Sequence, residues 1–449
     1  MKSFLMAAPL LVGLASAQAV GTSTAETHPK ITWKKCTGTG GSSCTTVSTE
    51  VVIDSNWRWL HDSKGNNCYD GNEWKTDVCS TATDCASKCQ MEGANYATTY
   101  GSTTSGDALT LKFITKHEYG TNIGSRFYLM NGSTKYQMFT LMNNEFTFDV
   151  DLSTVECGIN SALYFVAMDE DGGMSKYSTN KAGAKYGTGY CDAQCARDLK
   201  FVGGKANVEG WRPSSNDPNA GVGPMGGCCA EIDIWESNAY AYAFTPHACK
   251  DNKYHICETD TCGGTYSEDR FAGGCDANGC DYNPYRMGNT DFYGKGLKVD
   301  TSKKFTVVTQ FKPDRLTQFF VQNGKKIVAP APTFEGISDT GDVTPEFCTN
   351  QFKKFNDRDR FAEVGGFSQL NAALGVPMVL VMSIWDDHYS NMLWLDSTYP
   401  PEKEGEPGAA RGPCGQDTGV PSEVEASYPN AKVVWSNIRF GPVGSTVNV

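Results

Sequence analysis

Three carboxylates stand within six residues of this chain, between a cysteine pair and a run of apolar residues. Glu231, Asp233 and Glu236 follow Cys228-Cys229 in the stretch GCCAEIDIWESN. Two carboxyl groups held roughly 5–5.5 Å apart can hydrolyse a glycosidic bond with retention, one as nucleophile and the other as acid and base. Asp233 between them could hydrogen-bond the nucleophile, orient it and adjust its pKa. An acidic strand face open to solvent has the same pattern, so the spacing alone leaves both interpretations open.

A regular strand would not bring the two glutamates together. Alternation places Glu231, Asp233 and Trp235 on one face, turns the two intervening isoleucines to the core, and leaves Glu236 on the core side. At roughly 3.3 Å per residue, the Cα atoms of Glu231 and Glu236 would also lie about 16 Å apart. A β-bulge between them would bring Glu236 round to the other carboxylates. The chemistry therefore requires an irregular strand.

The N-terminus has the features of a secretory signal peptide. Lys2 precedes an apolar run from Phe4 to Leu14, and Ala15-Ser16-Ala17 resembles a small-residue cleavage site. The run is too short to span a bilayer. We therefore expect residues 1–17 to be a signal peptide and the protein to be secreted, with no membrane association. No Pro/Ser/Thr-rich segment interrupts the rest, so we expect residues 18–449 to form a single catalytic domain without a linker or carbohydrate-binding module.

The cysteine and charge content narrow the classes of partner. Eighteen cysteines in an oxidising compartment indicate up to nine disulfides. No Cys/His spacing suggests zinc, and the six histidines are dispersed, so we expect no metal and no cofactor. Acidic residues outnumber basic ones by 51 to 39, with no basic stripe along which nucleic acid could lie. We expect a monomer that binds an uncharged or cationic substrate.

Strand patterns dominate wherever the periodicity is clear, and helical patterns such as 82–90 and 342–355 are few and short. Asn323-Gly324 within residues 319–328 predicts a hairpin with a type I′ turn. The fold class predicted is all-β, with two packed antiparallel sheets. The segments rich in β-branched and aromatic residues are 145–151, 162–168, 305–311, 378–384 and 433–440.

Long loops rich in glycine and cysteine separate these strands, notably 183–195, 211–227 and 245–285. Loops of that length inside a compact domain are usually functional. Disulfides would let them stand over a sheet without a core of their own.

Four motifs in order resemble the fungal cellobiohydrolases of glycoside hydrolase family seven, and the resemblance extends from about Glu26 to the C-terminus. They are IDSNWRW at 53–59, AKYGTGYCDAQC at 184–195, GCCAEIDIWESN at 227–238 and WDDHYSNMLW at 385–394. The resemblance implies a jelly-roll β-sandwich whose concave face, roofed by loops, forms a tunnel for one cellulose chain. It also implies a secreted retaining cellulase that releases cellobiose from the reducing ends of cellulose and cello-oligosaccharides.

Matching motif to motif gives roles to individual residues. Glu231 takes the nucleophile position, Glu236 the proton donor, Asp233 the assisting carboxylate, and His247 a supporting position near the acid/base. The implied sugar-binding residues are Trp59 at the tunnel entrance, Trp57 further in, Trp385 just before the cleavage point, Trp394 just beyond it, Arg270 and Arg411 at the product site, and Arg126, Tyr164 and Gln194 along the tunnel.

The resemblance also implies disulfide pairs, Cys191 with Cys229 and Cys195 with Cys228, which would pin the loop that carries Gln194 against the catalytic strand. The tenth bridge of many family members is absent with both of its cysteines, which leaves nine. Three features are particular to this chain: His388 where a tyrosine is common, Asn278 where an aspartate is common, and one N-glycosylation sequon at Asn131.

Two other functions compete with the cellobiohydrolase. An endoglucanase of the same family would have shorter loops and an open cleft, whereas the segments 211–227, 245–285 and 396–414 are of full length here. A secreted β-sandwich lectin would bind sugar through its tryptophans without cleaving it. The presence of both Glu231 and Glu236 argues against a lectin, which has no use for a nucleophile and an acid.

Overall fold

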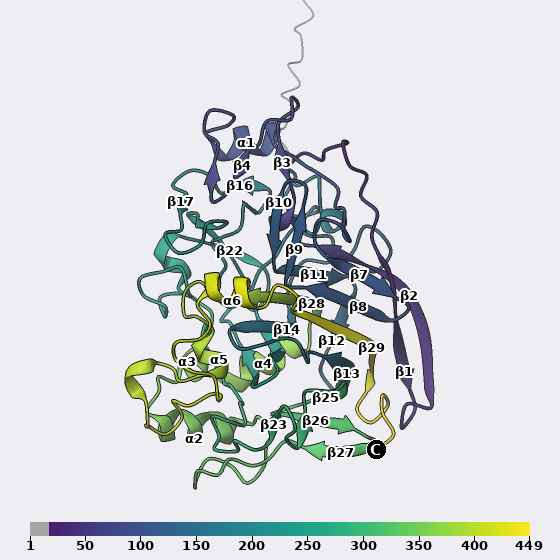
Figure 1. Ribbon diagram of the computed structural model, residues 1–449, viewed down its shortest axis with the longest axis vertical. Coiled ribbons are helices and arrows are strands. Elements are labelled where there is room, and N and C mark those ends of the chain that lie inside the picture. The colour runs from purple at the N-terminus through teal and green to yellow at the C-terminus, as the bar shows by residue number, and fades with distance from the viewer. Residues whose placement is uncertain (1–17) are drawn as a thin grey trace, which may run out of the picture.

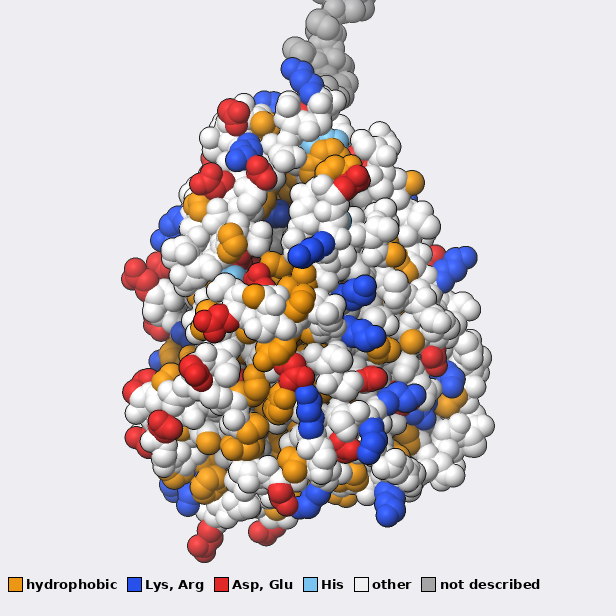
Figure 2. Space-filling model, in the orientation of Figure 1, with side chains coloured by type: hydrophobic (Ala, Val, Ile, Leu, Met, Phe, Trp, Pro, Cys, Tyr) orange, Lys and Arg blue, Asp and Glu red, His pale blue; other side chains and the backbone are white. Residues whose placement is uncertain are grey.

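Strands are the most frequent regular elements of this protein, and the short helices within residues 345–396 lie together at the lower left of Figure 1. The computed structural model describes residues 18–449, so the expected signal peptide lies outside the described residues. Within the described part of the chain, no helix is long and apolar enough to cross a membrane. Basic and acidic side chains are interspersed on the face shown in Figure 2, with hydrophobic side chains gathered down its middle.

The principal strands form two sheets that share one long strand. The first is ordered β21 (Tyr242–His247), β20 (Glu231–Ser237), β14 (Ile159–Val166), β28 (Pro377–Asp386) and β11 (Ser125–Leu129). The second is ordered β1 (Lys30–Thr37), β29 (Lys432–Pro442), β13 (Asn144–Asp151), β25 (Phe305–Lys312), β26 (Arg315–Gln322) and β27 (Lys325–Val328). The shared strand, β2 (Ser43–Ile53), pairs with β1 up to Glu50 and with β11 from Val51.

The two sheets pack face to face through aromatic side chains. Phe146 of β13 lies 5.0 Å from Phe165 of β14, centroid to centroid, and Phe148 of β13 lies 6.0 Å from Trp235 of β20. Every one of these side chains is fully buried. Interdigitation of the inner faces of two antiparallel sheets is the core of a β-sandwich, so the predicted fold class is confirmed.

Most of the predicted elements are present. Strands 145–151, 305–311, 378–384 and 433–440 correspond to β13, β25, β28 and β29. The hairpin turn has positive φ at both Asn323 and Gly324, as a type I′ turn requires. The predicted helices correspond to α1 (Ala82–Lys88) and α2 (Pro345–Phe355), each with a threonine side chain capping its N-terminus.

One strand begins earlier than its apolar pattern predicts. Residues 162–168 were expected, whereas β14 spans Ile159–Val166. Asn160 and Ser161 join the strand because their side chains hydrogen-bond Glu236 and Ser237 of the neighbouring β20. The apolar pattern marks only the buried part of the strand. Its polar first residues include Asn160, which hydrogen-bonds Glu236.

The remaining elements are short and line the loops. The helices are α3 (Arg360–Glu363), α4 (Gly366–Leu374), α5 (Leu393–Asp396) and α6 (Pro421–Ser427), and β7 (Ser102–Ser105), β8 (Ala108–Lys112) and β12 (Met138–Thr140) extend the two sheets. Two-stranded ladders are formed by β3 (Leu60–His61) with β6 (Gln90–Met91), β4 (Tyr69–Asp70) with β5 (Glu73–Trp74), β9 (Ile114–His117) with β10 (Gly120–Ile123), β15 (Phe201–Val202) with β16 (Lys205–Ala206), β17 (Arg212–Pro213) with β18 (Gly221–Val222), β19 (Met225–Cys228) with β22 (His255–Glu258), and β23 (Tyr293–Gly294) with β24 (Val299–Asp300).

All eighteen cysteines are paired, which confirms the nine expected bridges. The two implied pairs, Cys191–Cys229 and Cys195–Cys228, are present. The others are Cys36–Cys44, Cys68–Cys89, Cys79–Cys85, Cys157–Cys414, Cys249–Cys275, Cys257–Cys262 and Cys280–Cys348. Bridges therefore concentrate in the long loops, where little apolar core is available.

Candidate active site

A β-bulge in β20 assembles the three carboxylates. The register of β20 against β21 shifts between Asp233 and Glu236, and its register against β14 shifts over the same stretch. The extra residue turns Trp235 into the core, where it is fully buried, and brings Glu236 to the side of the other acids. The expectation that Trp235 shares the face of Glu231 was therefore wrong, and the requirement for an irregular strand is confirmed.

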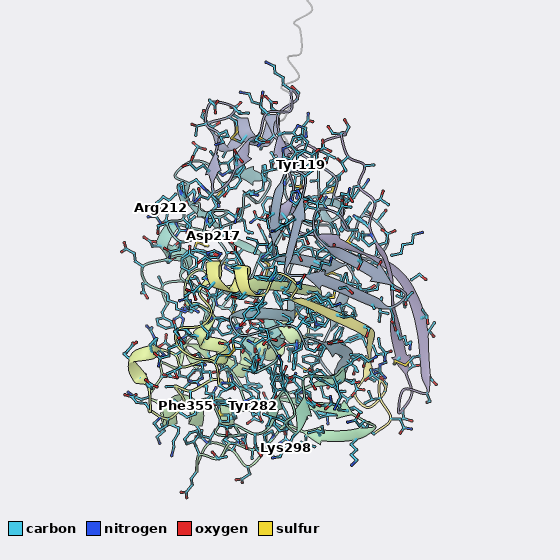
Figure 3. All side chains as sticks on the ribbon, viewed as in Figure 1. Tyr119, Arg212, Asp217, Tyr282, Lys298 and Phe355 are labelled. Atoms are coloured by element: carbon cyan, nitrogen blue, oxygen red, sulfur yellow. A yellow bond between two sulfur atoms is a disulfide. The ribbon has the colours of Figure 1, made fainter. Side chains whose placement is uncertain are left out.

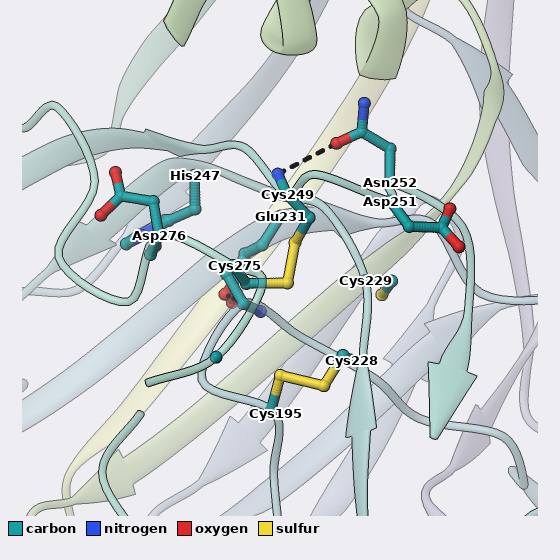
Figure 4. Close-up of a disulfide and its surroundings, with 12 residues drawn as sticks. Cys195, Cys228, Cys229, Glu231, His247, Cys249, Asp251, Asn252, Cys275 and Asp276 are labelled. Atoms are coloured by element: carbon teal, nitrogen blue, oxygen red, sulfur yellow. Dashed lines mark hydrogen bonds between the residues drawn. A yellow bond between two sulfur atoms is a disulfide. The ribbon is translucent and has the colours of Figure 1, made fainter. Parts of the chain in front are cut away.

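Glu231 is held by a backbone donor from a cross-linked loop. Its Oε2 accepts a hydrogen bond of 3.0 Å from the N–H of Ala193. Ala193 lies between Cys191 and Cys195, and both cysteines are bonded to the pair that precedes β20. Figure 4 shows the Cys195–Cys228 bridge with Glu231 in the same view. The donor and the acceptor thus belong to one covalently closed unit, which limits their relative movement.

Asp233 forms a relay with His247 of β21 and the carbonyl of Asp276. His247 Nδ1 lies 2.8 Å from the Asp276 carbonyl oxygen, and its Nε2 lies 2.9 Å from Asp233 Oδ2. A carbonyl only accepts, so Nδ1 carries a hydrogen. The Nε2 contact then holds one proton, either on a cationic His247 or on a neutral Asp233. Figure 4 shows His247 turned toward Asp276.

Glu236 has a different environment from the other two acids. The side-chain amide of Asn160 donates to its Oε1 at 3.0 Å, while the amide oxygen of Asn160 accepts from the N–H of Ser237. Burial raises the pKa of Glu236 to about 7, against the opposing effects of His247 and Asn160. Glu236 is therefore poised to hold a proton in weakly acidic solution and to release it near neutrality.

Burial also raises the pKa values of Glu231 and Asp233 above their ordinary range. For Glu231, the negative charges of Asp233 and Asp192 add to the rise, and His247 and the Ala193 N–H oppose it. For Asp233, the charge of Glu236 adds to the rise and a hydrogen bond with Glu231 opposes it. Three carboxyls so close together, two of them buried and one partly buried, cannot all be ionised, so the site retains protons. The Ala193 donor favours ionisation of Glu231 within this group.

The tryptophans expected near the entrance differ in exposure. Trp59 is 44 % exposed, its indole N–H bonds Asn67 at 2.8 Å, and its ring stacks on His61 with centroids 4.0 Å apart. Trp57 is partly buried, and its indole N–H donates to the carbonyl of Ile123. Trp59 is therefore the more exposed of the two rings.

Arg126 is connected to two other expected tunnel residues, Trp57 and Tyr164. Its guanidinium lies over the rings of Trp57 and Tyr190, 5.4 Å and 3.4 Å from their centroids, and bonds Asp54. Tyr190 in turn meets Tyr164 through their hydroxyl groups, 2.9 Å apart. Arg126 and Tyr164 are thus brought together with Trp57 through cation–π contacts and one hydroxyl–hydroxyl hydrogen bond.

Trp385 and Trp394 stack on one another, with centroids 6.3 Å apart and ring planes inclined by 29°. Asp387 orients the second ring, because its carboxylate accepts the indole N–H of Trp394 at 3.0 Å. Both rings pack against a small apolar cluster of Met392, Leu395 and Ala243, the last of these from β21, the strand next to β20. The pair therefore stands beside the catalytic strand.

The expected product-site arginines are fixed by their neighbours. Arg270 bonds Asn278, Thr265 and the carbonyl of Ala277, and the Gln194 amide reaches the same carbonyl at 2.6 Å. Arg411 bonds Asp281 at 3.2 Å. Asn278, at the position where an aspartate is common in the family, accepts from Arg270 at 2.7 Å but carries no charge.

Three residues of the site could not be identified from the sequence pattern. Asn160 stands in an apolar run, and Asp276 takes part through its backbone carbonyl. Asp192 is buried close enough to Glu231 to raise its pKa, and the quoted motif at 184–195 contains it without indicating that role. Each acts through spatial proximity, which spacing along the chain does not report.

The model of the glycosyl hydrolase family 7 matches residues 20–447 of this chain. The chain belongs to that family. A cellobiohydrolase from Melanocarpus albomyces, solved with cellotetraose, is 72% identical over 96% of this chain and 100% of its own, with a TM-score of 0.94. A cellobiohydrolase from Daphnia pulex is 48% identical with a TM-score of 0.93, over 96% and 100% of the two chains. The native endocellulase EGI of Humicola insolens is 38% identical with a TM-score of 0.79, over 95% and 99%.

Proposed function

We propose that this family 7 protein is a secreted retaining cellulase that hydrolyses β-1,4-glucosidic bonds and releases cellobiose from the reducing ends of cellulose chains, with residues 18–449 as its catalytic domain. The observation that carries the proposal is the bulge in β20, which gathers Glu231, Asp233 and Glu236 in one site, with the first two buried and Glu236 partly buried. Their different partners support different roles. A lectin would have no need for such a site.

The proposed reaction begins with Glu236 as acid. Its raised pKa keeps it protonated, so it can give its proton to the glycosidic oxygen while Glu231 attacks the anomeric carbon. The bond to the leaving sugar breaks and a glycosyl ester forms on Glu231. Esterification removes the negative charge of Glu231, which lowers the pKa of the neighbouring acids. Glu236 then takes a proton from water, and the water oxygen displaces Glu231 with net retention.

Asp233 and His247 have positioning roles in this scheme. The hydrogen bond between Asp233 and Glu231 holds the nucleophile in place, and His247 fixes Asp233 from the other side at 2.9 Å. The single proton in the Asp233–His247 contact can shift toward His247 as charge on Glu231 is lost. The pair thus buffers charge at the nucleophile without touching the sugar.

The aromatic residues support a glucan as substrate. Trp59, Trp57, Trp385 and Trp394 provide flat apolar faces edged by hydrogen-bonding groups, which suit the faces of pyranose rings. Arg270 and Arg411 would bind the departing disaccharide, while Arg126, Tyr164 and Gln194 would line the path of the chain. The cellotetraose in the Melanocarpus albomyces relative supports binding of cello-oligosaccharides here.

Two observations favour release of cellobiose from chain ends over random internal cleavage. At nearly equal coverage, the TM-score is 0.94 with a cellobiohydrolase and 0.79 with an endocellulase. Tyr266, in the loop 245–285, also packs edge-on against Tyr389, with ring centroids 5.4 Å apart. That contact joins the loop to the segment carrying Trp385 and Trp394 and supports a roofed channel.

Product analysis on crystalline cellulose tests the proposal. We expect soluble cellobiose to predominate from the first minutes, with few new ends left in the insoluble fraction. Labelling the reducing end of cello-oligosaccharides tells which end is cut. Proton NMR at early times should show the β-anomer first. A rise of internal ends in the solid would indicate an endoglucanase, and initial α-product would exclude retention.

A further inference from the structure

A second cluster of titratable side chains joins three segments of the fold outside β20. Asp217 comes from the loop 211–227, Asp386 ends β28, His388 follows it, and Glu425 belongs to α6. One ligand atom each from Asp386, His388 and Glu425 lies within 4.8 Å of the others. Figure 3 shows Asp217 next to the ribbon of α6.

His388 presents a free nitrogen to this cluster. Its Nδ1 lies 2.9 Å from the carbonyl oxygen of Asn216, which can only accept, so Nδ1 carries a hydrogen. Nε2 is the ring nitrogen on the side of the acids. Nε2 lies 3.9 Å from Asp386 Oδ1 and 4.0 Å from Asp217 Oδ2, which is too far for a hydrogen bond.

Asp386 is the buried member of the cluster and lacks a partner. Its side chain is 5 % exposed, and its Oδ2 makes no hydrogen bond. An unpartnered buried carboxylate oxygen costs free energy, so it indicates something that the side chains alone do not supply. Asp217 has already committed one oxygen, since Oδ1 accepts from the N–H of Asn219 at 2.7 Å. Its Oδ2 is the oxygen that faces His388.

The charges around Asp386 do not balance. The side chains that act on it are His388, Glu425 and Asp217, two of which are acids. Glu425 meets the same set, with Asp386 in hydrogen-bond range. Two carboxyl groups in contact require a shared proton or a shared cation.

We propose that Asp386, His388 and Glu425, with Asp217 as a fourth ligand, bind one divalent transition-metal ion of the Zn²⁺ class. Ligand atoms around a tetrahedral ion with bonds of about 2.0–2.2 Å lie roughly 3.4 Å apart, so the present spacings need only a small inward movement. The carbonyl bond at Nδ1 is the support that metal-bound histidines normally have. An imidazole nitrogen among carboxylates suits Zn²⁺ better than Ca²⁺ or Mg²⁺.

The comparison with His247 separates this cluster from the catalytic one. His247 also bonds a carbonyl through Nδ1, but its Nε2 lies only 2.9 Å from Asp233 Oδ2, a close ion-pair contact with no space for an ion between the two atoms. At His388 the corresponding separations are 3.9 and 4.0 Å. His247 is in direct contact with Asp233, whereas His388 Nε2 is far enough from its two acids for an ion to lie between them.

The bound ion would link the loop 211–227 to the end of β28 and to α6 through shared ligands, a connection that we call the clasp. Asp217 is the ligand from that loop, and Asp386 directly follows Trp385 in the sequence. The clasp would therefore restrain the loop next to a proposed sugar platform. We expect Zn²⁺ to slow amide hydrogen exchange at residues 214–220 and around the end of β28.

Titration of tag-free protein with Zn²⁺ by calorimetry tests the site. We expect one bound ion, and His388→Phe should weaken binding at least about 100-fold, since even outer-shell changes at metal sites cost 10–100-fold. His255→Phe is the matched control, because His255 Nδ1 also bonds a carbonyl, that of Lys253 at 2.9 Å, outside this cluster. Glu425→Gln provides a second test with little change of shape and should also weaken binding.

Two results would overturn the proposal. One is the absence of binding by the wild-type protein at millimolar Zn²⁺. The other is unchanged affinity and stoichiometry in both His388→Phe and Glu425→Gln, which would place the ion elsewhere, for example at Glu231, Asp233 and His247. Protection from exchange that is lost in both variants but kept in His255→Phe would confirm the clasp.

Discussion

Replacing Glu236 by Gln should make the protein more stable, and the gain should depend on pH. The pKa of Glu236 rises from 4.5 to about 7 on folding because the carboxyl group is buried. Below pH 4.5 the group is protonated in both states, and burial of the neutral acid carries no charge penalty. Between these values only the unfolded state releases the proton, so stability falls as the pH rises.

The size of the effect follows from that interval. At about 1.36 kcal/mol per pH unit, ionisation costs the wild-type protein roughly 3 kcal/mol by pH 8. Gln cannot ionise, and its Oε1 can still accept from Asn160. An unfolding entropy of about 2.1 cal/mol/K per residue over about 430 residues converts this difference to a rise in Tm of about 3–4 °C.

Differential scanning calorimetry at pH 4 and pH 8, at one scan rate, measures the effect. We expect Glu236→Gln to match the wild type at pH 4 and to exceed its Tm at pH 8. Glu404→Gln is the matched control, because Glu404 is exposed, and it should leave Tm unchanged at both values. A Tm difference of equal size at pH 4 and pH 8 would refute charge burial as its source.

Three further predictions concern activity. kcat/KM should fall as the pH rises through about 7, where Glu236 loses its proton. Asn160→Asp should shift this alkaline limb to higher pH, because a second carboxyl replaces the amide donor. A limb that does not move in the pH–rate profile would belong to another group. Removing the Cys195–Cys228 bridge by a double serine substitution should cost about 4 kcal/mol of stability in denaturant unfolding, for a separation of 33 residues. It should also lower kcat in steady-state kinetics, because the Ala193 N–H is held less firmly against Glu231. Full kcat would show that the bridge does not position Glu231. Trp59→Ala should reduce hydrolysis of crystalline cellulose several-fold, because the exposed Trp59 ring is proposed to bind the chain at the entrance, and should leave kcat/KM on an aryl cellobioside unchanged. Equal losses on both substrates would contradict a role confined to the entrance.

The sequence predicted the sandwich and most of its strands because burial on a sheet leaves a periodic or continuous apolar pattern. It also predicted that β20 must be irregular, since two carboxylates five residues apart cannot share a face of a regular strand. The position of the bulge could not be predicted from the sequence. Trp235 was expected beside the acids, yet packing against Phe148 and Tyr242 places that ring in the core.

The contacts that tune the acids were also outside the reach of the sequence. Asn160 lies 76 residues from Glu236 along the chain, and the Ala193 donor lies 38 residues from Glu231. Sheet pairing and two disulfides bring these groups together. The family motifs named Glu231 and Glu236, whereas the different environments that would divide their roles depend on the folded structure.

Trapping the glycosyl-enzyme is the most direct test of the central claim that Glu231 is the nucleophile and Glu236 the acid. An activated 2-deoxy-2-fluoro-β-cellobioside should inactivate the protein with one equivalent bound. The fluorine slows both formation and hydrolysis of the ester, and the good leaving group restores only the rate of formation, so the ester accumulates. Peptide mass spectrometry should then locate the sugar on Glu231, and Glu231→Gln should not be labelled. A label on Glu236 or Asp233, or full turnover without any covalent adduct, would contradict the assignment.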